Sequence, residues 1–424
     1  MTDGILRDVL RKAPQPWLWR ALLVALLAAP PCALLAVPTP AAAQGAELFR
    51  LDDARGDDNG AGTLLYPSRP DMKAGDLDLV AFSARIAREG TWFTVEFAHP
   101  IRDPGSEVTQ LGQTPVASIA RNGFYTFNVD VYIDTDRIFG SGSTETIPGR
   151  GVTIDRATAW EKCIVLTPRP DAARALLLRE MVAQGEDETR ARLGRVHRPD
   201  LDRIREQEEG GLNARYFFPT RVRVHGRSVD FFVPQEFLGG PASRHWAYAV
   251  LVTGADLEQY GRPGQLSPPV PTMFTMPVVR GLTADAFGIR SDADEGTPPV
   301  VDLLAAAPGE QAKILDNYDT RNGRLAAVPG VAPDGSASTL RGGGVVTSEA
   351  RAEAEALVGR ERGQSAEAAP GAGRSAVAPS AAPATTGPSR PVTERLQQLN
   401  KLLSDGLITQ AEYNELRRKV LSEL

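Results

Sequence analysis

Residues 52–79 have the sequence DDARGDDNGAGTLLYPSRPDMKAGDLDL. Aspartates lie near both ends of this stretch, and the glycines and asparagine between them favour turns. Carboxylates so close in sequence repel one another unless a cation or basic side chains offset their charge. The stretch therefore predicts a Ca²⁺-binding loop at the edge of a β-sandwich, with a solvated acidic turn as the alternative.

The candidate Ca²⁺ ligands are oxygen-bearing side chains of this stretch. Ca²⁺ takes about six to eight oxygen ligands, and backbone carbonyls of a glycine-rich loop can complete such a shell. For Asp76 and Asp78 the alternative role is to bond backbone amides in a turn. The Asp134-x-Asp136 pair is a weaker second candidate, for which a plain turn is the favoured interpretation. The predicted metal ligands are Asp52, Asp57, Asp58, Asn59, Asp76 and Asp78.

The composition argues against one class of partner. The 424-residue chain has a formal net charge of -6, whereas binding to nucleic acid requires a basic face. We therefore expect no nucleic-acid partner. The chain also contains 40 glycines and 33 prolines, which indicates many turns and a linker.

Residues 1–43 have the pattern of an export signal. A basic segment ending at Arg20 precedes the apolar run ALLVALLAAPPCALLAV, and Ala41-Ala42-Ala43 offers a cleavage site. A retained membrane anchor is less favoured because Pro30-Pro31 interrupts a run already short for a membrane span. We expect an exported protein that is periplasmic, cell-surface or secreted. After cleavage Cys163 would be the remaining cysteine, so no internal disulfide is expected.

Alternating apolar residues predict antiparallel strands along much of the chain. The clearest strand lies within residues 124–134, where every second residue from Phe127 to Ile133 is apolar and shares one face. Its other face carries polar residues and a tyrosine, and we expect that face to be the wetter one. Further strands are predicted within 78–86, 91–97, 163–166, 220–225, 228–234, 245–254 and 300–304, and a short helix over 310–315. The fold class is therefore mainly β, an antiparallel β-sandwich over residues 44–322.

Three other segments complete the predicted organisation. Residues 171–214 have an apolar period of about 3.6, which predicts a helical insertion that serves as a cover on the sheet or as a lid or partner surface. Residues 323–391, rich in Ala, Gly, Pro and Ser, are predicted to be a disordered linker. Residues 392–424 follow as a helical hairpin that would mediate self-association or protein docking. Its predicted oligomerisation residues are Leu399, Leu402, Leu403, Ile408, Tyr413 and Leu416.

Two segments resemble known families. The set Gly56-Asp57-Asp58-x-Gly60-x-Gly62, Leu65-Tyr66-Pro67 and Gly75-Asp76-Leu77-Asp78-Leu79 resembles the DOMON-like binding domain of glucodextranase, a relative of family 9 carbohydrate-binding modules. This resemblance implies a β-sandwich that binds carbohydrate at a cell surface, with Ca²⁺ as a structural ion and no hydrolytic activity. The hairpin pattern Leu399-x-x-Leu402-Leu403-x-x-Gly406-x-Ile408-Thr409-x-x-Glu412-Tyr413 resembles the short C-terminal domain abbreviated SHOCT, which implies oligomerisation or docking.

Sugar binding requires aromatic side chains that can stack on pyranose rings. The predicted ligand-binding residues are Tyr66, Tyr125, Tyr132 and Trp160, with Trp92 and Trp246 as further candidates. Tryptophans within alternating strands are most often core residues, which is the alternative for each of them. The sequence contains no nucleophile elbow, phosphate loop or histidine metal motif.

We therefore predict a non-catalytic protein that binds a carbohydrate or cell-envelope glycan. The alternatives are a structural envelope protein that binds a protein partner and a haem-carrying electron-transfer module.

Overall fold

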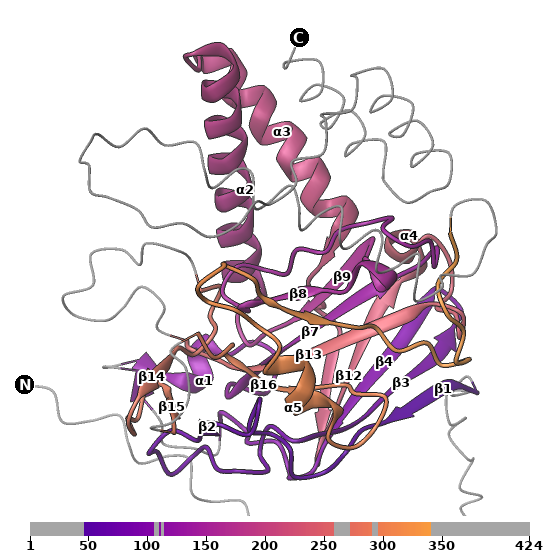
Figure 1. Cartoon of the computed structure of the whole chain (residues 1–424), viewed down its shortest axis with the longest axis vertical. Coiled ribbons are helices and arrows are strands. Elements are labelled where there is room, and N and C mark those ends of the chain that lie inside the picture. The colour runs from indigo at the N-terminus through magenta and orange to yellow at the C-terminus, as the bar shows by residue number, and fades with distance from the viewer. Residues whose placement is uncertain (1–45, 106–109, 112–113, 258–271, 291–295, 341–424) are drawn as a thin grey trace, which may run out of the picture. The chain divides into compact units, whose positions relative to one another are not determined.

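The computed structural model describes residues 46–105, 110–111, 114–257, 272–290 and 296–340. Within them two five-stranded sheets pack face to face as a β-sandwich (Figure 1). The first sheet has the strand order β1-β3-β4-β12-β11 and is antiparallel throughout. Its strands are β1 (Glu47–Asp52), β3 (Leu79–Ala87), β4 (Gly90–Phe97), β11 (Val222–His225) and β12 (Ser228–Pro234). The mainly β, antiparallel fold confirms the predicted fold class.

The second sheet has the strand order β10-β9-β7-β13-β16. Its neighbouring strands are antiparallel except β9 and β10, which run parallel. Its strands are β7 (Phe127–Asp134), β9 (Lys162–Leu166), β10 (Tyr216–Phe217), β13 (Ala247–Gly254) and β16 (Val300–Leu303). All the strands predicted from alternation are thus present in one sheet or the other.

Short elements border the two sheets. The minor strands are β2 (Leu64–Leu65), β5 (Gln110–Leu111), β6 (Thr114–Pro115), β8 (Val152–Ile154), β14 (Val278–Arg280), β15 (Phe287–Ile289) and β17 (Ala326–Val328). The short helices are α1 (Val116–Ile119), a 3-10 turn at Arg156–Thr158, α4 (Gln235–Leu238) and α5 (Glu310–Leu315). The last of these confirms the short helix predicted over 310–315.

Aromatic rings from both sheets form the core of the sandwich. Phe82 of β3 and Phe93 of β4 stack with 5.6 Å between their ring centroids, and Tyr248 of β13 also lies 5.6 Å from Phe82. None of these three residues is exposed to solvent. Burying one such side chain stabilises the fold by about 1.5–3 kcal/mol. Because the rings come from different sheets, this core holds the sandwich together.

The second sheet is also covered on the face that points away from the first sheet. Every residue of β7 and β13 is buried. Tyr132 and Trp160 belong there to one apolar cluster with Leu176 and Leu212 of the helical insertion and with Val328 of β17. The prediction that this face of β7 is the wetter one is therefore wrong, because segments distant in sequence exclude water from it.

A buried ion pair occupies this covered face. Arg150 Nε lies 2.5 Å from Asp130 Oδ2 of β7, and both side chains are 1% exposed. Arg150 Nη1 also donates hydrogen bonds to the Thr275 hydroxyl and to the Met273 carbonyl, the latter at 3.1 Å. A buried charge is tolerated when it is paired and hydrogen-bonded. The network thus explains how an aspartate occupies a dry face of β7.

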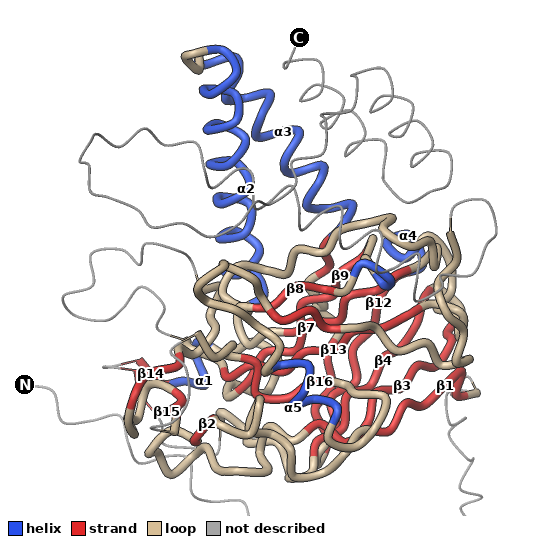
Figure 2. Tube along the Cα trace, in the orientation of Figure 1, coloured by secondary structure: helices blue, strands red, loops and turns tan. Residues whose placement is uncertain are grey.

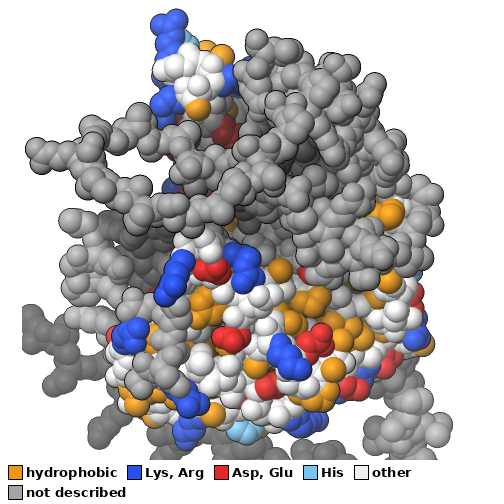
Figure 3. Space-filling view, in the orientation of Figure 1, with side chains coloured by type: hydrophobic (Ala, Val, Ile, Leu, Met, Phe, Trp, Pro, Cys, Tyr) orange, Lys and Arg blue, Asp and Glu red, His pale blue; other side chains and the backbone are white. Residues whose placement is uncertain are grey.

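The predicted helical insertion at 171–214 is confirmed as α2 (Pro170–Leu193) and α3 (Arg198–Arg215). Helix α2 ends at Gly194, whose φ of 76° is the left-handed conformation that favours glycine. The two helices cover the second sheet at their base and project away from it toward their connection (Figure 2). Basic side chains gather at this projecting tip (Figure 3).

The folded domain extends beyond the predicted boundary at residue 322. Strand β17 pairs with β8 in parallel, and Val331 pairs with Tyr248. The Arg137 guanidinium donates a hydrogen bond to the Ser336 carbonyl at 2.6 Å. A linker is therefore the wrong prediction for residues 323–340, because these residues complete the cover of the second sheet.

Three predictions fall outside the described residues. They are the export signal at 1–43, the remainder of the linker over 341–391, and the C-terminal hairpin at 392–424 with its six oligomerisation residues.

Candidate functional site

Among the described residues, four aspartates from distant parts of the chain gather beside β1 and β16, the terminal strands of the two sheets. Asp53 follows β1, Asp57 lies in the next turn, Asp78 immediately precedes β3, and Asp302 lies within β16. Carboxylate oxygens of Asp57, Asp78 and Asp302 all lie within 4.8 Å of one another. We name these four residues the acidic cluster.

Backbone amides fix the orientation of the most buried carboxylates. Asp302 Oδ2 accepts a hydrogen bond from Leu79 N at 2.7 Å, and its Oδ1 accepts one from Leu303 N at 2.7 Å. Asp78 Oδ2 accepts a hydrogen bond from Gly56 N at 2.8 Å. These contacts join the turn after β1, the start of β3 and strand β16, but they add no positive charge.

Other oxygens of the acidic cluster have no hydrogen-bond partner within the described part of the chain. They are Asp53 Oδ2, both carboxylate oxygens of Asp57 and Asp78 Oδ1, and all are shielded from solvent. Asp78 is 3% exposed. Leaving one buried polar atom unpaired costs about 1–3 kcal/mol, and more for a charged group. A set of buried carboxylate oxygens of this kind fits a hard divalent cation, which prefers oxygen ligands.

Burial and mutual repulsion raise the pKa values in the acidic cluster. Burial raises the pKa of Asp53 to about 7, and the charge of Asp57 contributes to the rise. Burial raises the pKa of Asp78 to about 6, with the neighbouring carboxylates acting in the same direction. The pKa of Asp302 lies well above its ordinary range, first because of burial and then because of Asp53 and Asp57. A bound divalent cation would favour the ionised carboxylates and oppose these shifts.

Two of the six predicted metal ligands, Asp57 and Asp78, belong to the acidic cluster. Asp58 is buried close by, but its Oδ2 accepts hydrogen bonds from the Tyr66 hydroxyl and from Gly75 N, the latter at 2.6 Å. Asp58 therefore connects its own turn to Tyr66 and to the turn at Gly75.

The remaining predicted ligands lie outside the cluster. Asp76 Oδ2 lies 3.2 Å from Arg102 Nε and belongs to a turn, which agrees with the alternative role given to it. Asp52 is exposed and pairs with Arg50 at 2.8 Å. Asn59 contributes its backbone carbonyl to the turn. The placement of Asp52 and Asp76 corrects their prediction as ligands, whereas the Asn59 side chain stays a predicted ligand.

Sequence reasoning missed Asp53 and Asp302 as members of the cluster. Asp302 lies within the otherwise apolar run PPVVDLLAAA, and it is completely buried. An acidic residue inside such a run is a usable signal, because a buried carboxylate needs a partner. Asp53 carries no comparable signal, since it is one of several aspartates in the same loop.

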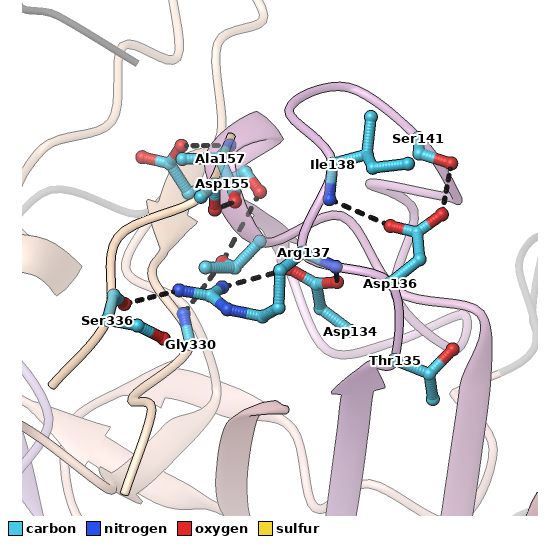
Figure 4. Close-up of polar contacts among 12 residues, drawn as sticks. Asp134, Thr135, Asp136, Arg137, Ile138, Ser141, Asp155, Ala157, Gly330 and Ser336 are labelled. Carbon is cyan, nitrogen blue, oxygen red and sulfur yellow. Dashed lines mark hydrogen bonds and ion pairs between the residues drawn. The ribbon is translucent and has the colours of Figure 1, made fainter. Parts of the chain in front are cut away.

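The Asp134-x-Asp136 pair lies in a second acidic cluster with Glu161. Arg137 Nη1 lies 3.0 Å from Asp134 Oδ2, and both side chains are buried. Asp136 accepts hydrogen bonds from Ile138 N and from the hydroxyl of Ser141, within its own turn (Figure 4). A protein side chain therefore supplies the positive charge here, which favours the plain turn over a metal site.

Most of the predicted sugar-stacking residues are enclosed. Tyr125, Tyr132 and Trp160 are 2%, 1% and 0% exposed. Tyr66 is partly exposed, but its hydroxyl donates to Asp58 and its ring packs edge-on against a core phenylalanine. Packing thus takes up the ring faces of the three enclosed side chains, and this corrects the prediction that they stack on a sugar.

The first sheet presents a partly exposed aromatic ring on its outer face. Buried and partly exposed residues alternate along β4, and Trp92, Thr94 and Glu96 are the partly exposed ones. The Trp92 ring lies 5.4 Å from the ring of Phe232 on the neighbouring strand β12. We name this surface of the first sheet the outer face. On this face Trp92 lies within a strand, packs against a residue of the neighbouring strand and remains partly exposed to solvent.

None of the helices in the described ranges is long and apolar enough to cross a membrane. No curated protein matches the chain. Residues 48–330 match the family model described as the C-terminal binding module, SLH-like, of glucodextranase. The matched segment contains the acidic cluster and both sheets except for Glu47, the first residue of β1. It confirms the family resemblance predicted from residues 56–79. The chain therefore belongs to the family of SLH-like C-terminal binding modules of glucodextranase.

Proposed function

We propose that this chain is a non-catalytic carbohydrate-binding protein that acts at the cell surface or outside the cell. The family is that of a binding module rather than of a catalytic domain, which supports both parts of the proposal. The observation that carries it is Trp92, a partly exposed indole supported by Phe232 in the middle of the outer face. Such a ring offers an apolar surface to the C–H groups of a pyranose ring while its edge stays hydrated.

We also propose that Ca²⁺ binds the acidic cluster as a structural ion. Asp57, Asp78 and Asp302 would supply carboxylate oxygens to it, and the charge of Asp53, which acts on Asp302, would add to the attraction for the cation. The donor set consists of oxygens alone, which suits Ca²⁺ better than metals that prefer nitrogen or sulfur. Its role would be to connect β16 with the loop that precedes β3.

Segments outside the described residues would deliver and attach the domain. We propose that residues 1–43 direct export, which agrees with a family of surface-binding modules. The hairpin at 392–424 would then mediate self-association or docking. If the hairpin assembles the protein, deleting residues 392–424 should lower the number of chains per particle that light scattering reports, beyond the loss of the deleted residues' own mass.

Retention on immobilised polysaccharide tests the carbohydrate proposal. We expect the exported chain to be retained on at least one glycan and Trp92→Ala to reduce that retention at least tenfold. The melting temperature should stay nearly unchanged, because Trp92 is not part of the sandwich core. Leu193→Ala is the matched control, since it removes a 54% exposed apolar side chain from the helical tip. Absence of glycan retention, together with a stable protein complex, would favour the envelope-protein alternative.

A further inference from the structure

The outer face carries two arginines beside its aromatic rings. Strand pairing places Trp92 opposite Phe232, and Phe232 N donates a hydrogen bond to the Arg221 carbonyl at 3.0 Å. The Arg221 guanidinium lies 4.1 Å from the centre of the Phe232 ring. The Arg223 guanidinium lies 4.7 Å from the centre of the Trp92 ring. Both arginines are exposed, so two guanidinium groups border the rings on one accessible surface.

Neither of these arginines has a carboxylate partner among the described residues. Asp230 lies opposite Arg223 in the strand register, but its Oδ2 pairs with Arg85 at 3.1 Å. Glu96, a second acid on this face, contacts two further arginines. The charges of Arg221 and Arg223 are therefore not offset by the sheet that carries them.

Guanidinium groups in this setting select for anions. Each presents a planar array of N–H donors that matches the two oxygens of a carboxylate. A stacked guanidinium keeps these donors free at its edge, because only its flat face contacts the ring. A neutral sugar would use the ring but leave both charges unpaired, whereas a sugar with a carboxylate would use both.

We propose that the outer face binds a glycan that carries carboxylate groups, such as a polymer of uronic acids. The sugar packs against the solvent-exposed part of the Trp92 indole that the stacked guanidinium of Arg223 leaves uncovered, and its carboxylate pairs with Arg221 or Arg223. This inference rests on the proposed carbohydrate-binding function and specifies its ligand class.

Affinity electrophoresis of the exported chain in alginate and in dextran gels tests this specificity. Alginate is the carboxylate-bearing probe and dextran the neutral one. We expect at least tenfold tighter binding to alginate, weakening as NaCl rises from about 0.05 M to about 0.5 M because exposed charge pairs are screened. The double variant Arg221→Gln/Arg223→Gln should lose this preference but keep its melting temperature.

The matched control is Arg195→Gln/Arg198→Gln, which removes two positive charges from the exposed tip of the helical insertion formed by α2 and α3. An unchanged alginate preference in the control supports the assignment to the outer face. An equal loss in both double variants would overturn it, because the effect would then come from overall charge. Binding to dextran without preference for alginate would overturn the inference and leave the proposed function standing. Binding to neither polymer would count against both.

Discussion

The two five-stranded sheets have similar strands but different surroundings. The first sheet buries one face against the sandwich core, and β4 accordingly alternates between buried and partly exposed residues. The second sheet is covered on both faces, so every residue of β7 is buried. The same kind of side chain therefore has different roles in the two sheets. Trp160 is enclosed beside the second sheet, whereas Trp92 reaches the solvent from the first.

Replacing each of these tryptophans by alanine should give the largest difference in the free energy of unfolding between the two sheets. Trp160→Ala leaves a large cavity in a fully enclosed site and should lower the free energy of unfolding by about 3–5 kcal/mol. Trp92→Ala should cost less than about 1 kcal/mol, because a partly exposed side chain loses little buried area. Urea denaturation followed by circular dichroism measures both values. Losses of similar size would show that the outer face is as enclosed as the covered one.

A second comparison is between an aspartate inside the acidic cluster, which joins the edges of the two sheets, and an aspartate outside it. Saturating Ca²⁺, at about a hundred times its dissociation constant, should stabilise the fold by about 2.7 kcal/mol. EDTA should lower the melting temperature of the parent chain accordingly. Asp302→Asn should abolish this response, whereas Asp52→Asn should retain it, since Asp52 is exposed and pairs with Arg50. A melting temperature insensitive to both Ca²⁺ and EDTA would contradict the proposed ion.

A partly buried glutamate in or beside each sheet should make the free energy of unfolding depend on pH, with opposite sign for the two sheets. This effect should be smaller than those predicted for the tryptophans and for Ca²⁺. Burial raises the pKa of Glu161, which precedes β9, from 4.5 to about 7. The fold thus favours its neutral form, and this contribution to stability is lost as the pH rises through about 4.5–7. Glu161→Gln should therefore stabilise the protein by about 1 kcal/mol at pH 8 and leave it unchanged near pH 4.

Glu96 on the first sheet is the matched control for Glu161. Burial acts to raise its pKa, but Arg50 and Arg227 outweigh burial, so its pKa lies below the usual value. Its stabilising contribution is present above a pH of about 4.5 and is lost as the pH falls further. Glu96→Gln should therefore weaken the fold slightly at neutral pH and have no effect in acid. Melting curves of both variants against the parent chain, over the same pH series, would reveal whether the signs differ.

The strands were predictable because their pattern is local. Alternation along residues 91–97 and along residues 228–234 identifies each segment as a strand without any knowledge of tertiary structure. The covering of the second sheet was not predictable in this way. It depends on helices α2 and α3 and on β17, and β17 pairs with a strand more than a hundred residues earlier in the sequence. Composition alone predicts a linker over residues 323–340.

The acidic cluster was predictable only in part, because some of its members are close in sequence and others are not. Asp57 and Asp78 come from the acidic stretch that was recognisable in the sequence. Asp302 joins them through a hydrogen bond to Leu79, a residue 223 positions earlier. Such a contact depends on how the two sheets pack against each other, and the spacing of residues along the sequence does not reveal it. The prediction that Tyr125, Tyr132 and Trp160 bind sugar is wrong, because alternation does not reveal which of the two faces of a strand is covered by other segments.

Because the second sheet is covered on both faces, the reactivity of Cys163 should depend on how fast that cover opens. It lies in β9 and is fully buried, and burial raises the pKa of its thiol well above the usual value. A thiol reagent can modify it only when β9 and the helices over it separate, because the thiolate is the reactive form. The rate of labelling in native buffer would therefore report how often the helical insertion lifts from the sheet. Removal of residues 1–43, which contain Cys32, would leave this single natural probe on the sheet face beneath the helices.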